Sequence, residues 1–230
     1  MVLFYGYYGI NVRGSIDIKG TRNNTVLLTV KDTTGFFNKE TKMGAWRGLK
    51  FQSEKNDNAS NITHAIIEFC KTVDFPKGGG IYINRYNNIK IENTTIRHCS
   101  ANLGGGIAIE SCDPKIFNCK FYNNGADYGG GALYSEESNF ELVNCLLYNN
   151  YAAYGGGINF IGGNPKIINC TVARNHATLE GGGIFAQVFT NLKLYNSIVF
   201  FNSSKKSEQV RLDPLEDADI QYCDVQGDIT

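Results

Sequence analysis

A glycine triplet recurs five times along this chain at a nearly constant interval, and this repeat limits the possible folds more than any other feature. The triplets start at Gly78, Gly104, Gly129, Gly155 and Gly181, so the intervals are 26, 25, 26 and 26 residues. Each triplet is followed by two apolar or aromatic positions in alternation, which predicts a short strand with one buried face. These pairs are Ile81 and Ile83, Ile107 and Ile109, Ala132 and Tyr134, Ile158 and Phe160, and Ile184 and Ala186.

A second repeated block follows each triplet after about ten residues, and its five copies start at Ile89, Pro114, Phe140, Pro165 and Leu192. The third and eighth positions of the block are always large apolar residues, as expected of inward-facing strand positions. The fifth position is always asparagine: Asn93, Asn118, Asn144, Asn169 and Asn196. The sixth position is Thr94, Cys119, Cys145, Cys170 and Ser197. The eleventh position is Cys99, Asn124, Asn150, Asn175 and Asn202.

Residue types that recur at a fixed interval predict columns of stacked side chains. An asparagine in a left-handed corner can hydrogen-bond its counterpart in the next coil, so we expect both asparagine columns to form buried ladders. The cysteines of the sixth position are expected to point inward as small, soft hydrophobes, without a metal or redox role.

A unit of about 25 residues cannot bury its apolar face alone, but stacked copies bury a continuous core at a spacing of about 4.8 Å. The sequence therefore predicts an all-β fold, a single-stranded right-handed parallel β-helix of about nine coils. We expect one domain over residues 1–230, with irregular opening coils at 1–77, regular repeats at 78–202, and a loop and last coil at 203–230. The chain is also expected to be a fragment of a longer protein, with neighbouring parts of that chain as partners.

The repeats resemble the pectin-lyase-like right-handed β-helix family, and within it the chlamydial polymorphic outer membrane protein type. That type is marked by the tetrapeptides GGA[ILV] and FxxN. Gly130-Gly131-Ala132-Leu133 and Phe121-Tyr122-Asn123-Asn124 match them literally, and the other copies read GGGI with LYNN, VARN or VFFN. The resemblance implies the fold and a role at the cell surface, and it implies no particular activity.

Charge and cysteine content exclude several classes of protein. The 22 basic and 22 acidic residues give a net charge of zero, which argues against nucleic acid as a partner. No apolar run is long enough to span a bilayer as a transmembrane segment. The seven cysteines contain no zinc-type pair and are expected to be free buried thiols. The glycosylation sequons at Asn93, Asn169 and Asn202 fall in the expected ladders, which favours a bacterial protein.

Enzymatic activity is the alternative function, because many β-helix proteins cleave acidic polysaccharides. A polysaccharide lyase needs a basic residue and a calcium held by carboxylates. The candidates here are Lys120, Arg97 or Arg174 as the base, with calcium as cofactor on Asp113 and Asp127. The usual catalytic signatures of β-helix hydrolases and lyases are absent, and the even coil length leaves no wall for a catalytic groove. We therefore favour a protein without catalytic residues, metal or cofactor.

Two outward-facing columns of the predicted solenoid carry aromatic residues. The first contains Tyr82, Ala108, Leu133, Asn159 and Phe185, and the second contains Arg97, Tyr122, Tyr148, Ala173 and Phe200. Exposed aromatic rings suit sugar rings or another protein, although stacked rings also simply stabilise a sheet. The candidate ligand-binding residues are Tyr82, Tyr122, Tyr148 and Phe185.

These observations predict a secreted or cell-surface module of a bacterium, with an adhesin-like or polysaccharide-binding role. Its partner would be a polysaccharide or a protein of a host or cell surface. A polysaccharide lyase or related carbohydrate-active enzyme is the alternative.

Overall fold

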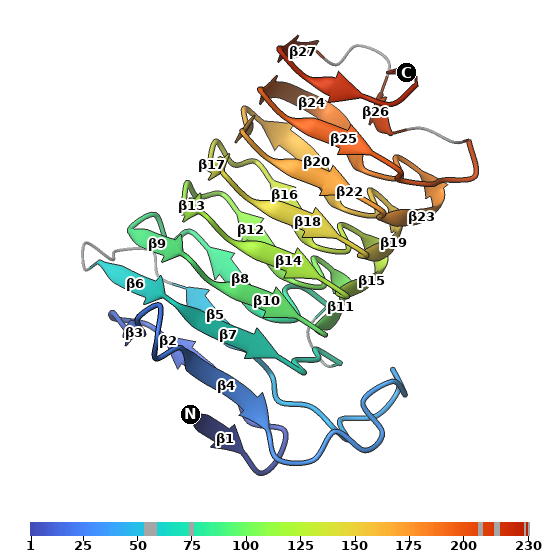
Figure 1. Ribbon diagram of the computed structural model, residues 1–230. Coiled ribbons are helices and arrows are strands. Elements are labelled where there is room, and N and C mark those ends of the chain that lie inside the picture. Colours follow the sequence, from blue (N-terminus) through green and yellow to red (C-terminus); the bar gives the residue numbers. More distant parts are fainter. Residues whose placement is uncertain (53–58, 74–75, 207–208, 214–216, 228, 230) are drawn as a thin grey trace.

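The computed structural model is an elongated solenoid in which each coil of the chain lies on the previous one (Figure 1). It describes residues 1–52, 59–73, 76–206, 209–213, 217–227 and 229. Every pairing between strands in these ranges is parallel, and the described residues contain no helix. The part of the chain that is described thus has no helix that could cross a membrane.

Sheet A contains one strand from each coil and has nine strands among the described residues. Its strands, in spatial order, are β1 (Val2–Phe4), β4 (Val26–Val30), β7 (Ala65–Glu68), β10 (Thr95–Arg97), β14 (Lys120–Tyr122), β18 (Leu146–Tyr148), β22 (Thr171–Ala173), β25 (Ile198–Phe200) and β28 (Asp224–Val225). Nine stacked strands correspond to eight full turns, so the predicted all-β parallel solenoid is confirmed, with about eight turns in the described residues.

Sheets B and C form two further faces, and the long strand β24 (Ile184–Tyr195) runs through both. Sheet B also contains β2 (Ile10–Val12), β5 (Leu49–Gln52), β8 (Ile81–Asn84), β12 (Ile107–Glu110), β16 (Leu133–Glu136), β20 (Ile158–Gly163) and β26 (Val210–Leu212). Sheet C also contains β3 (Asp17–Lys19), β6 (Ser60–Thr63), β9 (Ile89–Glu92), β13 (Lys115–Phe117), β17 (Glu141–Val143), β21 (Lys166–Ile168) and β27 (Asp217–Gln221).

A short sheet D connects sheet A back to sheet B in the regular coils. It consists of β11 (Ser100–Leu103), β15 (Gly125–Gly129), β19 (Tyr151–Tyr154) and β23 (His176–Glu180). Each of its strands ends next to the glycine-rich turn that leads into sheet B, which explains the position of the glycine repeat.

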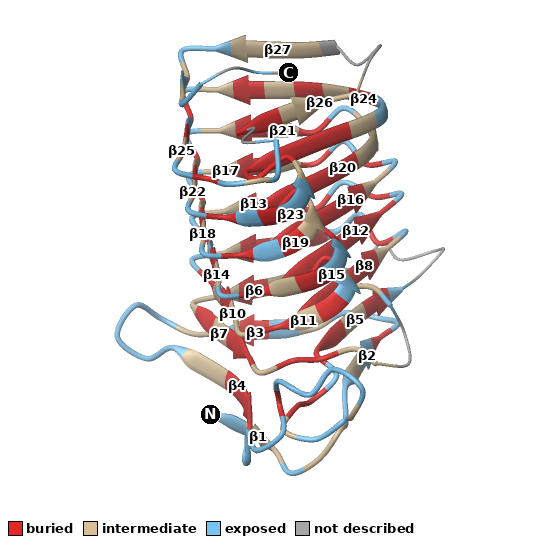
Figure 2. Cartoon of the chain, turned by 90° about the vertical axis from the view of Figure 1, so that its right-hand side faces the viewer, coloured by how far each residue is buried: buried red, intermediate tan, exposed pale blue. Residues whose placement is uncertain are grey.

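The interior of the solenoid is one apolar core that extends from Val12 to Val210 (Figure 2). In strands β10, β14 and β18 of sheet A the central residue points inward: Ile96, Phe121 and Leu147 have no exposed surface. Because successive strand residues face opposite sides, the flanking residues of these strands point outward.

The third glycine repeat starts one residue later than the triplet pattern predicts. Ile107 pairs with Leu133, and Ala108 pairs with Tyr134. Leu133 therefore points into the core, whereas Tyr134 lies on the outer face, so our assignment of Tyr134 as an inward residue is wrong. Ala132 does lie in the core, at the turn before the strand. The reason is that Gly130, with φ of 67°, is the left-handed residue of this repeat. A Cβ atom there would lie 2.2 Å from the carbonyl oxygen of Leu133, so only glycine fits.

The fifth-position asparagines do not form a buried ladder. Asn93, Asn118, Asn144, Asn169 and Asn196 are all exposed, and each has φ between 50° and 55°. Their shared property is the left-handed conformation of the corner between sheets C and A, which asparagine tolerates better than most residues. The sequons at Asn93 and Asn169 are thus on exposed side chains, and burial gives no argument against glycosylation there.

The eleventh-position column is the buried ladder, as predicted. The Oδ1 atom of Asn150 accepts hydrogen bonds from the backbone N and the Nδ2 of Asn124, both at 3.1 Å. The same pair of contacts joins Asn150 to Asn175 and Asn175 to Asn202. Each Nδ2 group also donates to a carbonyl oxygen of the previous coil, such as that of Phe121 for Asn150.

The sixth-position cysteines are buried free thiols that form an inward column, as predicted. The Sγ atom of Cys145 accepts a hydrogen bond from the backbone N of Cys119, and the Sγ of Cys170 accepts one from Cys145 N. Ser197 continues the column because its hydroxyl accepts from Cys170 N in the same way. Among the seven cysteines, Cys223 alone is only partly buried.

The C-terminal part, residues 203–230, where we expected a loop before the last coil, contains regular structure already before that coil. Strand β26 pairs with Ile184–Ala186 and extends sheet B by one coil, and β27 continues sheet C. The core residue Val210 explains why this part of the stretch packs on the solenoid.

Candidate functional site

Two tyrosines form a ring stack on the outer face of sheet A. Tyr122 ends β14 and Tyr148 ends β18, and the two residues are direct partners in the parallel register. Their ring centroids are 4.9 Å apart with an angle of 18° between the planes. Both side chains are half-buried, so the pair is accessible from one side.

Arg97 extends this column by one coil and is fixed by two partners. Its Nη1 donates to the hydroxyl of Tyr122 at 2.7 Å, and its Nε and Nη2 contact Oε2 of Glu68 at 2.7 and 2.6 Å. Burial works against its charge, but these bonds to Tyr122 and Glu68 raise the pKa of Arg97 above its ordinary value. Arg97 is therefore a positioned cation and a poor base.

Lys120 lies on the same face, and Arg174 lies at the corner where β22 ends. Lys120 starts β14, and because Phe121 between them points inward, Lys120 and Tyr122 both point outward. Arg174 follows β22 directly, is exposed, and has a left-handed backbone with φ of 56°. We call Arg97, Lys120, Tyr122, Tyr148 and Arg174 the aromatic strip. The structure thus places two of the predicted ligand-binding residues on one face with Arg97 and Lys120, and Arg174 at the edge of that face.

The next position of the tyrosine column is Ala173, the register partner of Tyr148. One face of the Tyr148 ring is covered by Tyr122, and on the other side the neighbouring coil offers only a methyl group. Among the described residues, the aromatic stack thus stops at Tyr148, and one face of its ring has no aromatic neighbour.

Tyr82 and Phe185, the other predicted ligand-binding residues, point outward as expected but are covered. Tyr82 is 5% exposed and Phe185 is 3% exposed. Leu103, from sheet D, packs over Tyr82, Ala108 and Tyr134, and the ring of Tyr154 stacks on Phe185 at 5.6 Å. The turn from sheet D into sheet B covers this column, so these two rings are not available as an exposed binding surface.

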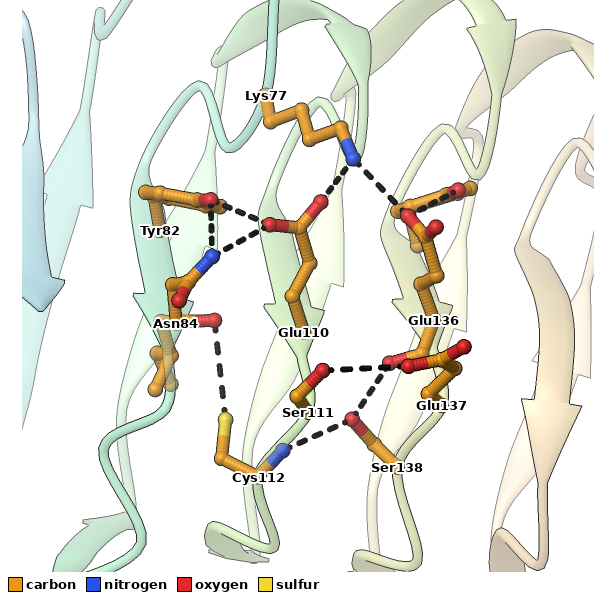
Figure 3. A network of polar contacts seen from close by, with 11 residues as sticks. Lys77, Tyr82, Asn84, Glu110, Ser111, Cys112, Glu136, Glu137 and Ser138 are labelled. Atoms are coloured by element: carbon orange, nitrogen blue, oxygen red, sulfur yellow. Dashed lines mark hydrogen bonds and ion pairs between the residues drawn. The ribbon is translucent and has the colours of Figure 1, made fainter. Parts of the chain in front are cut away.

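A cluster of polar side chains lies above this covered column on the outer face of sheet B (Figure 3). Lys77 contacts the carboxylates of Glu110 and Glu136, the latter at 2.9 Å. Tyr82 donates its hydroxyl proton to Glu110, and Tyr134 donates to Glu136 at 3.0 Å. We call these five residues the Lys77 cluster. Asn84 supports it by donating to Oε2 of Glu110 at 2.8 Å.

The electrostatics of the Lys77 cluster keep its charges in place. Burial disfavours the charge of Glu136, but the hydrogen bond and charge of Lys77 outweigh it and lower the pKa of Glu136. Burial also opposes the charge of Lys77, yet its bonds to Glu110 and Glu136 raise the pKa of Lys77. Glycoside hydrolysis needs a general acid whose pKa is raised, whereas the pKa of Glu136 is lowered. The arrangement is that of a closed ion-pair network.

The structure places the two predicted calcium ligands on different parts of the coil. Asp113 lies before β13, where its Oδ1 accepts from the backbone N of Asn139 in a ladder of exposed turn residues. Asp127 lies in β15 of sheet D and forms an ion pair with Lys39. Among the described residues, no group of three or more His, Cys, Asp or Glu side chains could hold a metal ion. The geometry thus brings no acidic cluster to Lys120, Arg97 or Arg174.

Sequence reasoning missed two other groups. Lys77 was not considered, although the 26-residue interval from Glu110 to Glu136 already places these carboxylates in neighbouring coils. Tyr128 and Tyr151 in sheet D are 49% and 43% exposed, more than the tyrosines of the aromatic strip. They lie in the segment between the two sequence blocks, which carries no strict pattern.

Comparison with known proteins identifies the fold family. A family model described as "Right handed beta helix region" matches residues 6–199. No curated protein and no solved structure matches the chain. The narrower resemblance to chlamydial repeats therefore continues to depend on the tetrapeptide motifs alone.

Proposed function

Because this chain belongs to the right-handed β-helix family, we propose that it binds an acidic polysaccharide along the outer face of sheet A. The stacked pair Tyr122 and Tyr148 carries the proposal, because Arg97 lies 5.8 Å from the centroid of the Tyr122 ring and Lys120 points outward from the same strand. Sugar rings pack on aromatic side chains, and Lys120 and Arg174 would neutralise carboxylates of successive sugar units. The module would act as an adhesin-like part of a protein that is secreted by a bacterium or displayed on its surface.

The contacts and positions of the charged residues favour binding over catalysis. Arg97 is engaged by Glu68 and Tyr122, and the candidate calcium ligands Asp113 and Asp127 lie elsewhere on the coil. A lyase would need a base and a metal-bound carboxylate at the same place. We do not propose a protein with acidic and aromatic residues as the partner; the tests below would point to one if no polysaccharide bound.

The test is the affinity of the chain for polygalacturonate, measured by affinity electrophoresis, with dextran as the neutral comparison. We expect retardation by polygalacturonate only. Tyr148→Ala should weaken it at least ~tenfold, which corresponds to about 1.4 kcal/mol. Tyr148→Phe should retain it, because the ring is kept. Tyr8→Ala is the control, since Tyr8 is an exposed tyrosine outside the aromatic strip.

Two results would contradict the proposal. Equal retardation of Tyr148→Ala and the unmodified chain would remove the aromatic strip as the site. Release of unsaturated sugar products in the presence of calcium, abolished by Lys120→Ala, would instead establish the lyase alternative.

A further inference from the structure

The outer face of sheet B is hollowed next to the Lys77 cluster, over the opening coils. The walls of this pocket include Arg47, Lys50, Thr72, Lys77 and Tyr82. Lys50 on β5 and Tyr82 on β8 are register partners, so their side chains point outward side by side. Arg47 and Lys77 each precede the glycine that leads into a strand of sheet B, and they project from that corner.

Cations line the pocket, and one of them, Lys77, is already paired with Glu110 and Glu136. The described lining residues include three cations and no carboxylate. The Nζ of Lys50 lies 5.4 Å from the centroid of the Tyr82 ring, which forms part of the wall. Burial, and then the positive charge of Arg47, lower the pKa of Lys50, and the negative charge of Glu110 opposes this shift only in part. The two cations are thus close enough to repel each other, and an anion between them would relieve this repulsion.

Thr72 provides a second, independent observation. Its Oγ1 is buried and has no hydrogen-bond partner among the described residues, although Thr72 lines the pocket. Buried hydroxyls almost always have a partner, and an unpaired one calls for an explanation. A ligand oxygen in the pocket would accept the hydrogen bond of this hydroxyl.

The size of the pocket limits the ligand to a small group. Its volume of about 60 Å³ has room for a few water molecules, which is enough for one carboxylate or sulfate group. Guanidinium groups bind such planar or tetrahedral oxyanions through two parallel hydrogen bonds, and ammonium groups act as point charges.

We propose that this pocket is an oxyanion-binding site, in which Arg47 and Lys50 hold the carboxylate or sulfate group of an anionic ligand. Lys77 lines the same pocket and forms ion pairs with Glu110 and Glu136. Its ammonium group would therefore be shared between the bound anion and these two carboxylates. The site is independent of the aromatic strip, because it lies on sheet B in the opening coils and not on sheet A.

The experiment is a titration of the full chain with sodium glucuronate or sodium sulfate at constant ionic strength, followed through backbone amide NMR signals. We expect saturable shifts at Gly48, Lys50, Gly78 and Tyr82, and none with glucose. The two anions distinguish a carboxylate site from a sulfate site. The pKa of Lys50, followed through its side-chain carbon signals, should rise when the anion binds.

Lys50→Met keeps the apolar stem and removes the charge, so it should weaken binding at least ~tenfold, while Lys50→Arg should retain it. Lys115→Met, at an exposed lysine of sheet C, should have no effect. Shifts that do not saturate with either anion, or that persist unchanged in Lys50→Met, would refute the site. Tyr148→Ala should leave this titration unchanged, so failure here is distinguishable from failure of polysaccharide binding.

Discussion

At the scale of single residues, two asparagine columns that look alike in sequence have different physical roles. The exposed column, to which Asn144 belongs, provides left-handed corners with φ near 50°. The buried column, to which Asn150 belongs, satisfies backbone groups of neighbouring coils through its amides. Position in the coil, and not residue type, decides whether an asparagine amide is a core hydrogen-bonding group.

We therefore expect Asn150→Ala to destabilise the protein by about 3 kcal/mol, because several buried groups lose their partner. Asn144→Ala should cost only about 1 kcal/mol, from the strain of alanine in a left-handed conformation. Asn144→Gly, which relieves that strain, serves as the control and should be close to neutral. Urea unfolding gives all three values, and equal losses for Asn150→Ala and Asn144→Ala would refute the assignment.

At the scale of elements, the outer face of sheet B is held by the Lys77 cluster, which spans β8, β12 and β16. Lys77, which forms an isolated bridge with Leu103 of sheet D, lies over carboxylates that are one coil apart. The cluster thus ties three consecutive coils together outside the core, and its contribution depends on the ionisation of its members.

The lowered pKa of Glu136 predicts the direction of this pH dependence. A carboxyl group whose pKa is lower in the folded state stabilises the fold above its unfolded value of about 4.5, and this contribution is lost as the pH falls through the folded pKa. Between about pH 5 and pH 3, the Glu136→Gln variant should therefore lose less stability than the unmodified chain. The measurement is the urea concentration at the unfolding midpoint as a function of pH, which should fall less steeply for the variant.

Glu137→Gln is the matched control for this measurement. Glu137 is the next residue along the chain, and its carboxylate faces the hydroxyl of Ser111 instead of Lys77. Its variant should follow the acid profile of the unmodified chain. Identical profiles for Glu136→Gln and the unmodified chain would show that the ion pair contributes nothing.

At the scale of the whole molecule, the fold is a sum of nearly equivalent coils around one continuous core. Each coil contacts mainly its two neighbours, so the protein should tolerate a change in coil number far better than a change of register within a coil. Gly129 and Tyr154 are register partners, and both precede the left-handed glycine of their repeat.

Deletion of residues 130–154 removes one complete coil and joins Gly129 to Gly155. We expect this variant to fold, with parallel β circular dichroism and a denaturant m-value lower by about 10%, in proportion to the surface that is lost. Deletion of residues 130–142 removes half a coil and should prevent folding. Failure of the full-coil deletion alone to fold would contradict the equivalence of the coils.

The sequence by itself determined the solenoid, because an interval of 25 or 26 residues leaves stacking as the only way to bury the apolar faces. It also determined the inward cysteine column, since residue types of similar size recur there. The register of the third repeat could not be read from the triplet, since three glycines look alike and only the backbone shows that Gly130 is left-handed.

The tertiary structure alone decided which outward residues are accessible. Strand alternation places Tyr82, Phe185, Tyr122 and Tyr148 on outer faces, but alternation says nothing about what packs over them. The turn from sheet D covers the first two, and sheet A leaves the other two open beside Lys120 and Arg174. Accessibility depends on contacts between segments that lie far apart in the repeat, and a periodic pattern carries no information about such contacts.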